Sequence, residues 1–205
     1  HQRRLDAAEL ARAARFHRDE DRVRFVVGRS TLRELLARAV GVDAAAIAFE
    51  TDSHGKPRMP VDTGAGLHFN SSHSGRWVLH AFADVAVGVD VEQVLPEMAS
   101  LEDFAWILSA DERAFVQTAE APLRAAALAT VWVRKEAYVK ALGEGLDREL
   151  AGIGETFTEI SVVARQHGNA LIPWPTKTGG QIYLAQVGLA SAPEMFATAR
   201  AANQM

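Results

Sequence analysis

The sequence Gly88-Val89-Asp90-Val91-Glu92 sets the architecture of this chain, because acidic and apolar residues alternate along it. Side chains of a β-strand point alternately to the two faces of a sheet. The stretch therefore predicts a strand with Asp90 and Glu92 on one face and Val89 and Val91 in the core. Acidic pairs of this kind are common on solvent-facing edges, but the apolar flanks make such an edge the less natural interpretation here.

Further along the chain, Trp132-Val133-Arg134-Lys135-Glu136-Ala137-Tyr138-Val139-Lys140 predicts a helix. Glu136 and Lys140 would lie one turn apart on one face, where an ordinary i,i+4 ion pair is the alternative to a functional role. The surrounding residues are largely apolar, which predicts a buried helix, and a buried carboxylate is costly without a cation. Three carboxylates and one ammonium group converging on a cleft would make a Mg²⁺ site with a cation beside it, the combination that phosphoryl chemistry needs.

Length and composition are those of a globular protein with one domain or two small lobes. The 205 residues are 48% hydrophobic and 23% charged. Cysteine is absent, so disulfides and thiolate metal sites are excluded and a cytoplasmic enzyme is expected. Every apolar run falls far short of the ~20 residues that span a bilayer, so no membrane partner is expected. Because the chain begins with His1 rather than Met, further native residues are expected before it.

Charge is spread unevenly along the chain. Residues 1–40 hold ten Arg and six acids, a net charge of +4, whereas the whole chain carries −4 and the remainder therefore −8. This basic end predicts an anionic partner, either a phosphate-rich small molecule or an acidic protein surface, although solvated helix faces would have the same composition. Nucleic acid is not expected, because few aromatic residues interleave with the basic ones.

The hydrophobic periodicity predicts an α+β chain in which helices precede strands in each half. Helices are expected over about residues 5–16, 21–40 and 122–143, with an amphipathic segment over 101–108 and a capping box from Ser109 to Glu112. Strands are expected at residues 47–50, 67–70, 77–83, 85–92, 156–164 and 182–188. We also expect a link rich in Pro and Gly over 173–180, a fraying tail after Pro193, and a boundary between the halves at Pro96.

Two upstream segments carry groups suited to phosphate. The stretch Phe69–Trp77 places Asn, Ser and His side chains in a predicted loop between strands, where they could donate to phosphate oxygens. A nucleophilic Ser-His pair is a rival interpretation, but the sequence has no G-x-S-x-G elbow. The turn Gly55-Lys56-Pro57-Arg58 presents a cation on a stiff backbone, which is useful for a phosphate and is also common in ordinary surface turns.

Together these segments resemble the 4′-phosphopantetheinyl transferases, specifically the larger single-chain type that modifies carrier domains of peptide and polyketide synthases. The matches to the family's motifs are, in chain order, Gly55-Lys56-Pro57, Asn70-x-Ser72-His73-Ser74-Gly75-x-Trp77, Gly88-Val89-Asp90-Val91-Glu92, and Trp132-x-x-Lys135-Glu136-Ala137-x-x-Lys140-x-x-Gly143-x-Gly145-Leu146. Near the N-terminus, Asp21, Arg24, Gly28 and Leu32 also look like the family's helices. The resemblance covers residues 12–146.

The resemblance implies roles for individual residues. Asp90, Glu92 and Glu136 would hold Mg²⁺ against the pyrophosphate of coenzyme A. Lys140 would stabilise or protonate the leaving 3′,5′-ADP, and either Glu136 or a metal-bound water that it orients would accept the proton from the attacking hydroxyl. The residues that would bind phosphates on the adenosine 3′-phosphate side are Arg12, Arg15, Lys56, Ser72 and His73.

The resemblance also implies an α+β fold of two similar lobes, residues 1–96 and 97–205, related by a pseudo-twofold axis with coenzyme A between them. The expected reaction transfers the 4′-phosphopantetheine arm of coenzyme A to a serine of an apo acyl- or peptidyl-carrier protein and releases 3′,5′-ADP. A cytoplasmic monomer is expected. A Mg²⁺-dependent phosphodiesterase or nuclease could use the same acidic trio, and a non-catalytic module that binds coenzyme A or a carrier protein is the third hypothesis.

Overall fold

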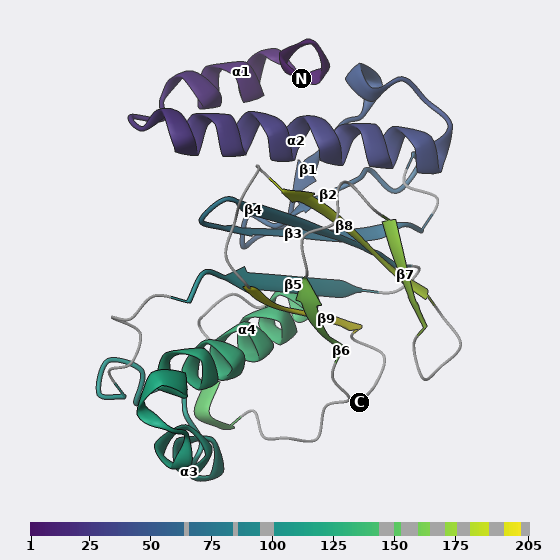
Figure 1. The fold of residues 1–205 in the computed structure, drawn as a ribbon. Coiled ribbons are helices and arrows are strands. Elements are labelled where there is room, and N and C mark those ends of the chain that lie inside the picture. Colours follow the sequence, from purple (N-terminus) through teal and green to yellow (C-terminus); the bar gives the residue numbers. More distant parts are fainter. Residues whose placement is uncertain are drawn as a thin grey trace.

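The computed structural model describes residues 1–63, 66–83, 86–94, 101–143 and 150–152, together with the backbone of four later strands at 160–164, 171–175, 181–188 and 195–201. The elements stack in layers (Figure 1). Helices α1 (Ala7–Ala14) and α2 (Asp19–Val40) lie above one sheet, a second sheet lies beneath it, and helix α4 (Arg124–Leu142) packs against the second sheet. This mixture of helices and antiparallel sheets agrees with the predicted α+β class.

The helices begin and end at residues whose chemistry suits those positions. Asp6 caps α1 in a capping box with Glu9. Gly41 ends α2 and Gly143 ends α4, both in the left-handed conformation at φ 75° that glycine adopts without strain. The two predicted N-terminal helices are thus confirmed. Short 3₁₀ turns are found at η1 (Gln2–Arg4), η2 (Ala44–Ala46), η4 (Ala121–Leu123) and η6 (Leu150–Gly152).

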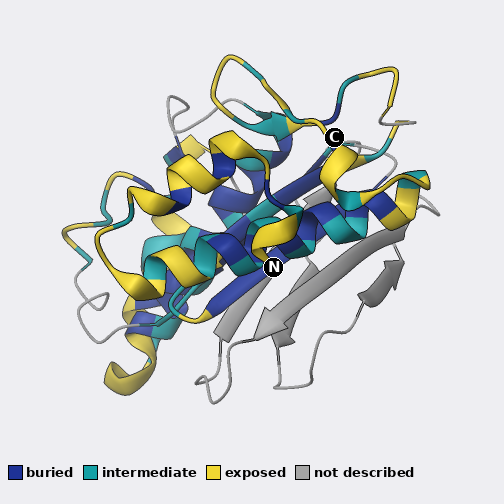
Figure 2. Cartoon of the chain, turned by 90° about the horizontal axis from the view of Figure 1, so that it is seen from above, coloured by how far each residue is buried: buried dark blue, intermediate teal, exposed yellow. Residues whose placement is uncertain are grey.

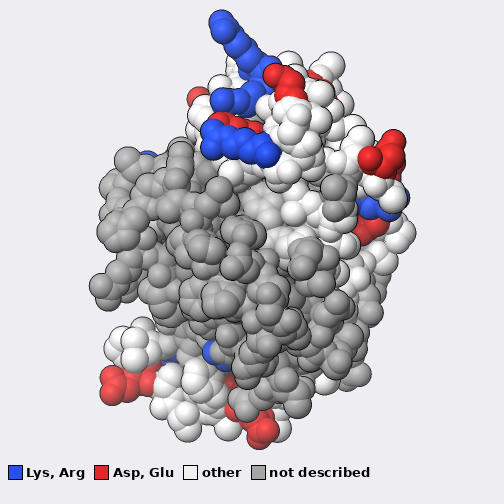
Figure 3. Space-filling model, turned by 90° about the vertical axis from the view of Figure 1, so that its right-hand side faces the viewer, with Lys and Arg blue, Asp and Glu red and all other residues white. Residues whose placement is uncertain are grey.

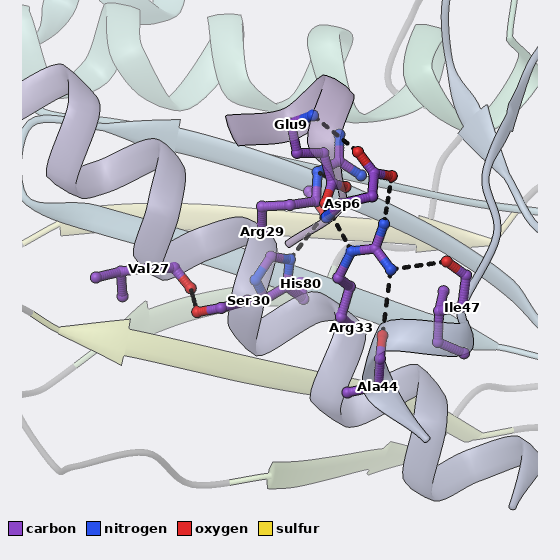
Figure 4. A network of polar contacts seen from close by, with 10 residues as sticks. Asp6, Glu9, Val27, Arg29, Ser30, Arg33, Ala44, Ile47 and His80 are labelled. Carbon is purple, nitrogen blue, oxygen red and sulfur yellow. Dashed lines mark hydrogen bonds and ion pairs between the residues drawn. The ribbon is translucent and has the colours of Figure 1, made fainter. Parts of the chain in front are cut away.

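A buried guanidinium group ties α1 to α2 (Figure 4). Arg33 of α2 is fully buried and donates to the carboxylates of Glu9 at 2.7 Å and Asp6 at 2.6 Å. It also donates to the backbone oxygens of Ala44 at 3.2 Å and Ile47 at 2.7 Å. A buried charge is tolerated when it is paired and hydrogen-bonded, and Arg33 meets this condition. The network fixes both α1 and the segment after α2 in place on α2.

In the part of the chain that the structure describes, three antiparallel sheets carry the strands. The smallest is the hairpin of β1 (Glu50–Thr51) and β2 (Pro57–Arg58). The second has the order β3-β4-β8-β7 and consists of β3 (His68–Ser74), β4 (Trp77–Ala83), β8 (Gln181–Gly188) and β7 (Leu171–Pro175). The third has the order β5-β9-β6 and consists of β5 (Val87–Glu92), β9 (Met195–Ala201) and β6 (Ile160–Ala164). Late strands therefore extend both sheets that begin in the first half of the chain.

Several strand predictions differ from the structure. Of the strand predicted at 47–50, only Glu50 lies in a strand, the short β1, and residues 47–49 have no regular structure. The carbonyl of Ile47 accepts from the Arg33 side chain rather than from a neighbouring strand. The predicted loop at 69–77 is mostly β3, with only Gly75 and Arg76 in the turn. The predicted link at 173–180 contains part of β7, and the predicted tail contains β9. Strand β9 pairs with β5, which is far away in the sequence, and local composition carries no signal for such pairing. Strand β7 pairs with the next strand, β8.

The strands predicted near 77–83, 85–92 and 182–188 are confirmed. The strand predicted at 156–164 is confirmed over β6, and its first residues lie outside the described part of the chain. The boundary at Pro96 also lies outside the described residues, so the division at that point stays a prediction.

Helix α3 (Ala110–Thr118) begins at the predicted capping box of Ser109 and Glu112. The amphipathic segment 101–108 forms turns. The carbonyl of Ile107 accepts from the buried Lys135 ammonium at 2.5 Å, which removes an acceptor that a continuing helix would use. Among the helices of the described residues, none combines the length and the apolar character needed to cross a membrane.

Apolar residues fill the space between helices and sheets, and exposed residues gather on the outer faces of the helices (Figure 2). One cluster lies between α2 and strands β3 and β4 and consists of Leu32, Leu36, Ala37, Ile47, Met59, Phe69 and Phe82. A second cluster surrounds α4 and consists of Ile107, Leu108, Val116, Ala127, Leu128, Val131, Tyr138, Val139 and Leu150. The first cluster holds α2 on its sheet, and the second packs α4 against α3, the segment 101–108 and η6.

Helix α4 lies directly on β5 at Gly88. A Cβ atom added to Gly88 would lie 2.0 Å from the carbonyl oxygen of Ala137 and 2.3 Å from the amide nitrogen of Ala141. Both are backbone atoms, which cannot turn aside as the end of a flexible side chain can. Glycine is therefore required for this approach, which brings the acidic face of β5 beside the turn of α4 that holds Glu136 and Lys140.

We expect Gly88→Ala to lower the free energy of unfolding by about 3 kcal/mol or more, because the added methyl group must push α4 away from β5. Urea unfolding measures the change. Gly152→Ala is the matched control: nothing lies within 4 Å of its added Cβ, so the loss should stay within about 0.5 kcal/mol. Equal stability of the two variants would contradict the described contact.

Candidate functional site

Side chains from β3, β5 and α4 meet around Asp90. Along β5, Val89 and Val91 are fully buried in the core, as the alternation predicts, and Asp90 is buried with them. The Asp90 carboxylate accepts hydrogen bonds from the Ser72 hydroxyl at 2.6 Å and from the Lys140 ammonium at 2.5 Å. Residues from three separate elements therefore converge on one carboxylate.

Lys140 links the carboxylates of β5 and α4. Its Nζ atom lies 2.5 Å from Asp90 Oδ1 and 3.6 Å from Glu136 Oε2. It also lies 3.4 Å from the hydroxyl of Ser72. An ammonium group this close to two carboxylates offsets charges whose burial would otherwise be costly. The structure thus brings together Asp90, Glu136 and Lys140, which the sequence placed in two distant stretches.

Glu92 lies two residues beyond Asp90 on the same strand and has other neighbours. Its Oε2 atom accepts from the Ser74 hydroxyl at 2.7 Å, and that hydroxyl accepts from the backbone amide of Gln93 at 3.0 Å. The side chain of Trp132 also hydrogen-bonds to the Glu92 carboxylate. Burial raises the pKa of Glu92, and the negative charge of Asp90 acts in the same direction.

Burial also raises the pKa of Glu136. The charges of Asp90 and Glu92 act in the same direction, and the ammonium of Lys140 opposes them. A carboxylate with a raised pKa holds a proton more tightly than usual, so Glu136 is a stronger base than an exposed glutamate.

Two buried carboxylate oxygens at this centre, Asp90 Oδ2 and Glu136 Oε1, have no hydrogen-bond partner among the described residues. Buried acceptors are seldom left unpaired, and carboxylate oxygens are the ligands that a hard divalent cation takes. The carboxylate oxygens of Asp90 and Glu136 are therefore suitable ligands for Mg²⁺. As the side chains stand, no group of three His, Cys, Asp or Glu residues in the described ranges could hold a metal ion, so the full set that includes Glu92 stays a prediction.

A basic pocket, formed by α1, α2, β3 and β4, adjoins this centre. Its polar lining consists of Arg12, Arg24, Arg29, Ser71, Ser72, His73 and His80. Arg12, Ser72 and His73 are among the predicted phosphate-binding residues, and the latter two lie on β3 rather than in a loop. Because Ser72 also donates to Asp90, the pocket and the carboxylate centre share a wall. On the face shown in Figure 3, Lys and Arg side chains gather at the α1–α2 end.

Four lining residues were not predicted as site residues: Arg24, Arg29, Ser71 and His80. Arg24 and Gly28 lie one turn apart on the face of α2 that meets β4, where a Cβ added to Gly28 would lie 3.0 Å from Val78. The i,i+4 spacing of Arg24 and Gly28 in the sequence indicates that both lie on the same face of the helix. Ser71 and His80 carry no such local signal, since strand pairing alone brings them opposite each other, with their side chains hydrogen-bonded at 2.8 Å.

Two predicted phosphate ligands lie outside the basic pocket. Arg15 is exposed at the end of α1. Lys56 donates from Nζ to the backbone oxygens of Val87 at 3.2 Å and Lys140 at 2.5 Å. Burial lowers the pKa of Lys56. Phosphate binding by Arg15 and Lys56 therefore stays a prediction.

Comparison with known proteins agrees with the family resemblance. A family model described as the 4′-phosphopantetheinyl transferase superfamily matches residues 86–193, and one described as 4′-phosphopantetheinyl transferase, N-terminal, matches residues 2–84. The chain is 32% identical over 161 residues to the 4′-phosphopantetheinyl transferase Sfp of Bacillus subtilis (strain 168), a match that covers 78% of this chain and 67% of Sfp.

Two further relatives carry the same description. The chain is 33% identical over 150 residues to 4′-phosphopantetheinyl transferase psf-1 of Bacillus pumilus, covering 73% of this chain and 62% of that protein. It is 34% identical over 145 residues to 4′-phosphopantetheinyl transferase HetI of Nostoc sp. (strain PCC 7120), covering 69% of this chain and 61% of HetI. The chain thus spans about two thirds of the length of the curated relatives it matches.

His80 at the floor of the basic pocket should make stability depend on pH. Burial lowers the pKa of His80 to about 4, against 6.5 for a free imidazole. Between these values the unfolded chain takes a proton that the folded protein resists, so His80 should cost about 2 kcal/mol of stability as pH falls from 7 to 5. In urea unfolding at both pH values, His80→Gln should lose less stability than wild type by that amount. The exposed His17→Gln is the control, and equal losses in all three proteins would refute the effect.

Proposed function

Because the chain belongs to the 4′-phosphopantetheinyl transferase superfamily, we propose that it transfers the 4′-phosphopantetheine arm of coenzyme A to a serine of an apo acyl- or peptidyl-carrier protein and releases 3′,5′-ADP. The observation that carries this proposal is the convergence of Asp90, Glu136 and Lys140, from β5 and α4, beside a basic pocket. Such a centre supplies a cation for a diphosphate and a base for a hydroxyl group in one place.

Lys140 is the residue placed to offset charge on the leaving group. Its ammonium lies among Asp90, Glu136 and Ser72, and its side chain remains partly exposed. Negative charge builds up on the bridging oxygen as the bond to 3′,5′-ADP breaks, and a cation fixed at that position stabilises the transition state more than the ground state. Lys140 can also donate a proton to the departing phosphate.

Glu136 is the proposed proton acceptor. Its Oε1 atom is buried without a partner, and its raised pKa makes it a stronger base than an exposed carboxylate. It would take the proton of the carrier serine as that hydroxyl attacks the phosphorus bearing the pantetheine arm, either directly or through a water that it orients. Direct transfer and transfer through a water are both part of the proposal, because the Glu136 carboxylate accepts the proton in either case.

Asp90, Glu92 and Glu136 would hold a Mg²⁺ ion, and the unpartnered oxygens of Asp90 and Glu136 support this assignment. Bound there, the ion would neutralise charge on the diphosphate of coenzyme A. Ser72 and Ser74 each donate to a carboxylate of this set, so β3 orients the acidic face of β5.

The basic pocket is the proposed site for the adenosine 3′-phosphate. Arg12 and His73 line it together with Ser72, whose hydroxyl connects the pocket to Asp90. Guanidinium groups form strong charge-assisted hydrogen bonds with phosphate, so three arginines in the lining suit a dianionic group. Coenzyme A would then extend from this pocket, with its diphosphate at the carboxylate centre.

The finer architecture is part of the same proposal. Helix α2 packs on β4 and helix α4 packs on β5 and β9, a repeated helix-on-sheet arrangement that supports two similar lobes related by a pseudo-twofold axis. Their division into residues 1–96 and 97–205 stays a prediction, because the sheet under α2 also contains β7 and β8 and the sheet under α4 contains β5. A cytoplasmic monomer whose partners are coenzyme A and an apo carrier protein, with no nucleic acid or membrane, completes the proposal.

We expect an apo carrier protein incubated with this protein, coenzyme A and Mg²⁺ to gain one phosphopantetheine arm, as measured by intact mass. Lys140→Met should slow the transfer by about 100- to 1,000-fold, because the cation at the leaving group is lost. Asp90→Ala and Glu136→Ala should abolish it. Arg38→Met, which alters an exposed ion pair on α2, should retain the wild-type rate.

Two other results of this assay would replace the proposal. Cleavage of coenzyme A without any mass gain on the carrier protein would indicate a phosphodiesterase. Binding of coenzyme A without either reaction would indicate a non-catalytic module. Wild-type rates in Asp90→Ala or Glu136→Ala would remove that residue from the mechanism.

We expect Arg12→Met to weaken binding of coenzyme A by about 10-fold, the worth of one charge-assisted hydrogen bond. Binding of 3′-dephospho-coenzyme A should change little, because the lost partner is the 3′-phosphate. Calorimetric titration of both ligands into wild type, Arg12→Met and Arg38→Met makes the comparison. Equal weakening for both ligands would place Arg12 against another part of the molecule.

A further inference from the structure

Hydrogen bonds within the hairpin of β1 and β2 fix the backbone at Lys56. The carboxylate of Asp52 accepts from the backbone amides of His54 at 2.9 Å and Lys56 at 2.8 Å. The backbone of Asp52 also pairs with Lys56 and Gly55, each at 3.0 Å. Gly55 takes φ 81°, a conformation that lets the chain reverse direction here. Lys56 therefore leaves the hairpin from a well-ordered backbone.

The ammonium of Lys56 is directed at protein backbone. Its Nζ atom donates to the carbonyl oxygen of Lys140 at 2.5 Å and to that of Val87 at 3.2 Å. The side chain is half-buried, and it lines a cavity with Leu142 and Gly143 rather than the basic pocket with Arg12 and His73. Two of its three N–H donors are thus used within the protein.

Both acceptors are carbonyl groups at places where a helix or a sheet does not supply a hydrogen-bond donor: the end of α4 and the edge strand β5. Lys140 belongs to the last turn of α4, whose carbonyls have no partner within the helix. A cation at this end also interacts favourably with the negative end of the helix dipole. Val87 begins β5, an edge strand of its sheet. One ammonium group therefore joins the end of α4 to the start of β5.

These two backbones carry the reactive centre. The residue whose carbonyl Lys56 holds is the same Lys140 whose Nζ lies 2.5 Å from Asp90, and Val87 adjoins Gly88, where α4 touches β5. The geometry points to Lys56 as a positioning residue that holds the last turn of α4 against β5, and so keeps the Lys140 ammonium at the Asp90 carboxylate. This role is an alternative to the predicted contact with phosphate and rests on the proposed transferase function.

The test compares Lys56→Met, which keeps the length of the side chain and removes its charge, with Arg58→Met. Arg58 lies on the same hairpin, is exposed, and forms an ion pair with Glu50 at 2.9 Å, so the control removes one cation from the same place. With the full chain, apo carrier protein, coenzyme A and Mg²⁺, Lys56→Met should lower kcat by about 10-fold or more, since slight displacement of a reacting group costs this much. Its KM for coenzyme A should stay within about twofold of wild type, and Arg58→Met should match wild type in both constants.

Two further measurements separate this role from phosphate binding and from general loss of stability. Hydrogen exchange at the Gly143 amide, which bonds to the Val139 carbonyl at the end of α4, should quicken by about 10-fold in Lys56→Met and not in Arg58→Met. The preference for coenzyme A over 3′-dephospho-coenzyme A in calorimetric titration should be unchanged. A rise in KM with kcat intact, or a loss of that preference, would overturn the positioning role and make Lys56 a phosphate ligand.

The exchange and titration measurements need no turnover. If wild type transfers nothing, the proposed function fails, while faster exchange at Gly143 in Lys56→Met would still support the clamp between α4 and β5. Unchanged exchange at Gly143 in Lys56→Met would overturn the clamp whether or not transfer occurs.

Discussion

The direct contact between β5 and α4 at Gly88 is the constraint on which the site depends. Because no Cβ atom separates the two backbones, the turn of α4 that holds Glu136 and Lys140 lies against the strand that carries Asp90. A helix displaced by the width of one methyl group would leave the Lys140 ammonium out of hydrogen-bond reach of Asp90. Each of these partly buried charges would then lose its ion-pair contact with the other, which costs more than an unmade contact on the surface.

The buried charges of this protein fall into two kinds. Arg33 and Lys135 are fully covered, and each donates both to a carboxylate and to backbone carbonyls, so their charges are well satisfied and serve to hold elements together. At the reactive centre, by contrast, Asp90 and Glu136 each keep a buried oxygen without a partner. Groups left unsatisfied in this way lower stability, and proteins tend to retain them where a ligand or a reaction uses them.

The N-terminal helices supply the positive side of the site. Arg33 anchors α1 on α2, and Gly28 allows α2 to approach β4 closely, so that Arg12 and Arg24 face the polar end of β3. The basic pocket therefore depends on a buried ion pair on one side of α2 and a close helix–sheet contact on the other. On the face shown in Figure 3, Lys and Arg side chains gather at this end of the molecule.

Local chemistry was enough to predict the helices, the capping box of α3, the glycine that ends α4, and the acidic face of β5, because these follow from spacings of two to four residues along the chain. The same spacings identified Asp90, Glu136 and Lys140. Tertiary structure alone decided that β9 pairs with β5, that Ser71 meets His80, and that the Lys56 ammonium donates to two backbone carbonyls. Each of these joins segments far apart in the sequence, where the free energy of packing and of hydrogen-bond satisfaction selects the partner and residue type alone carries no information about it.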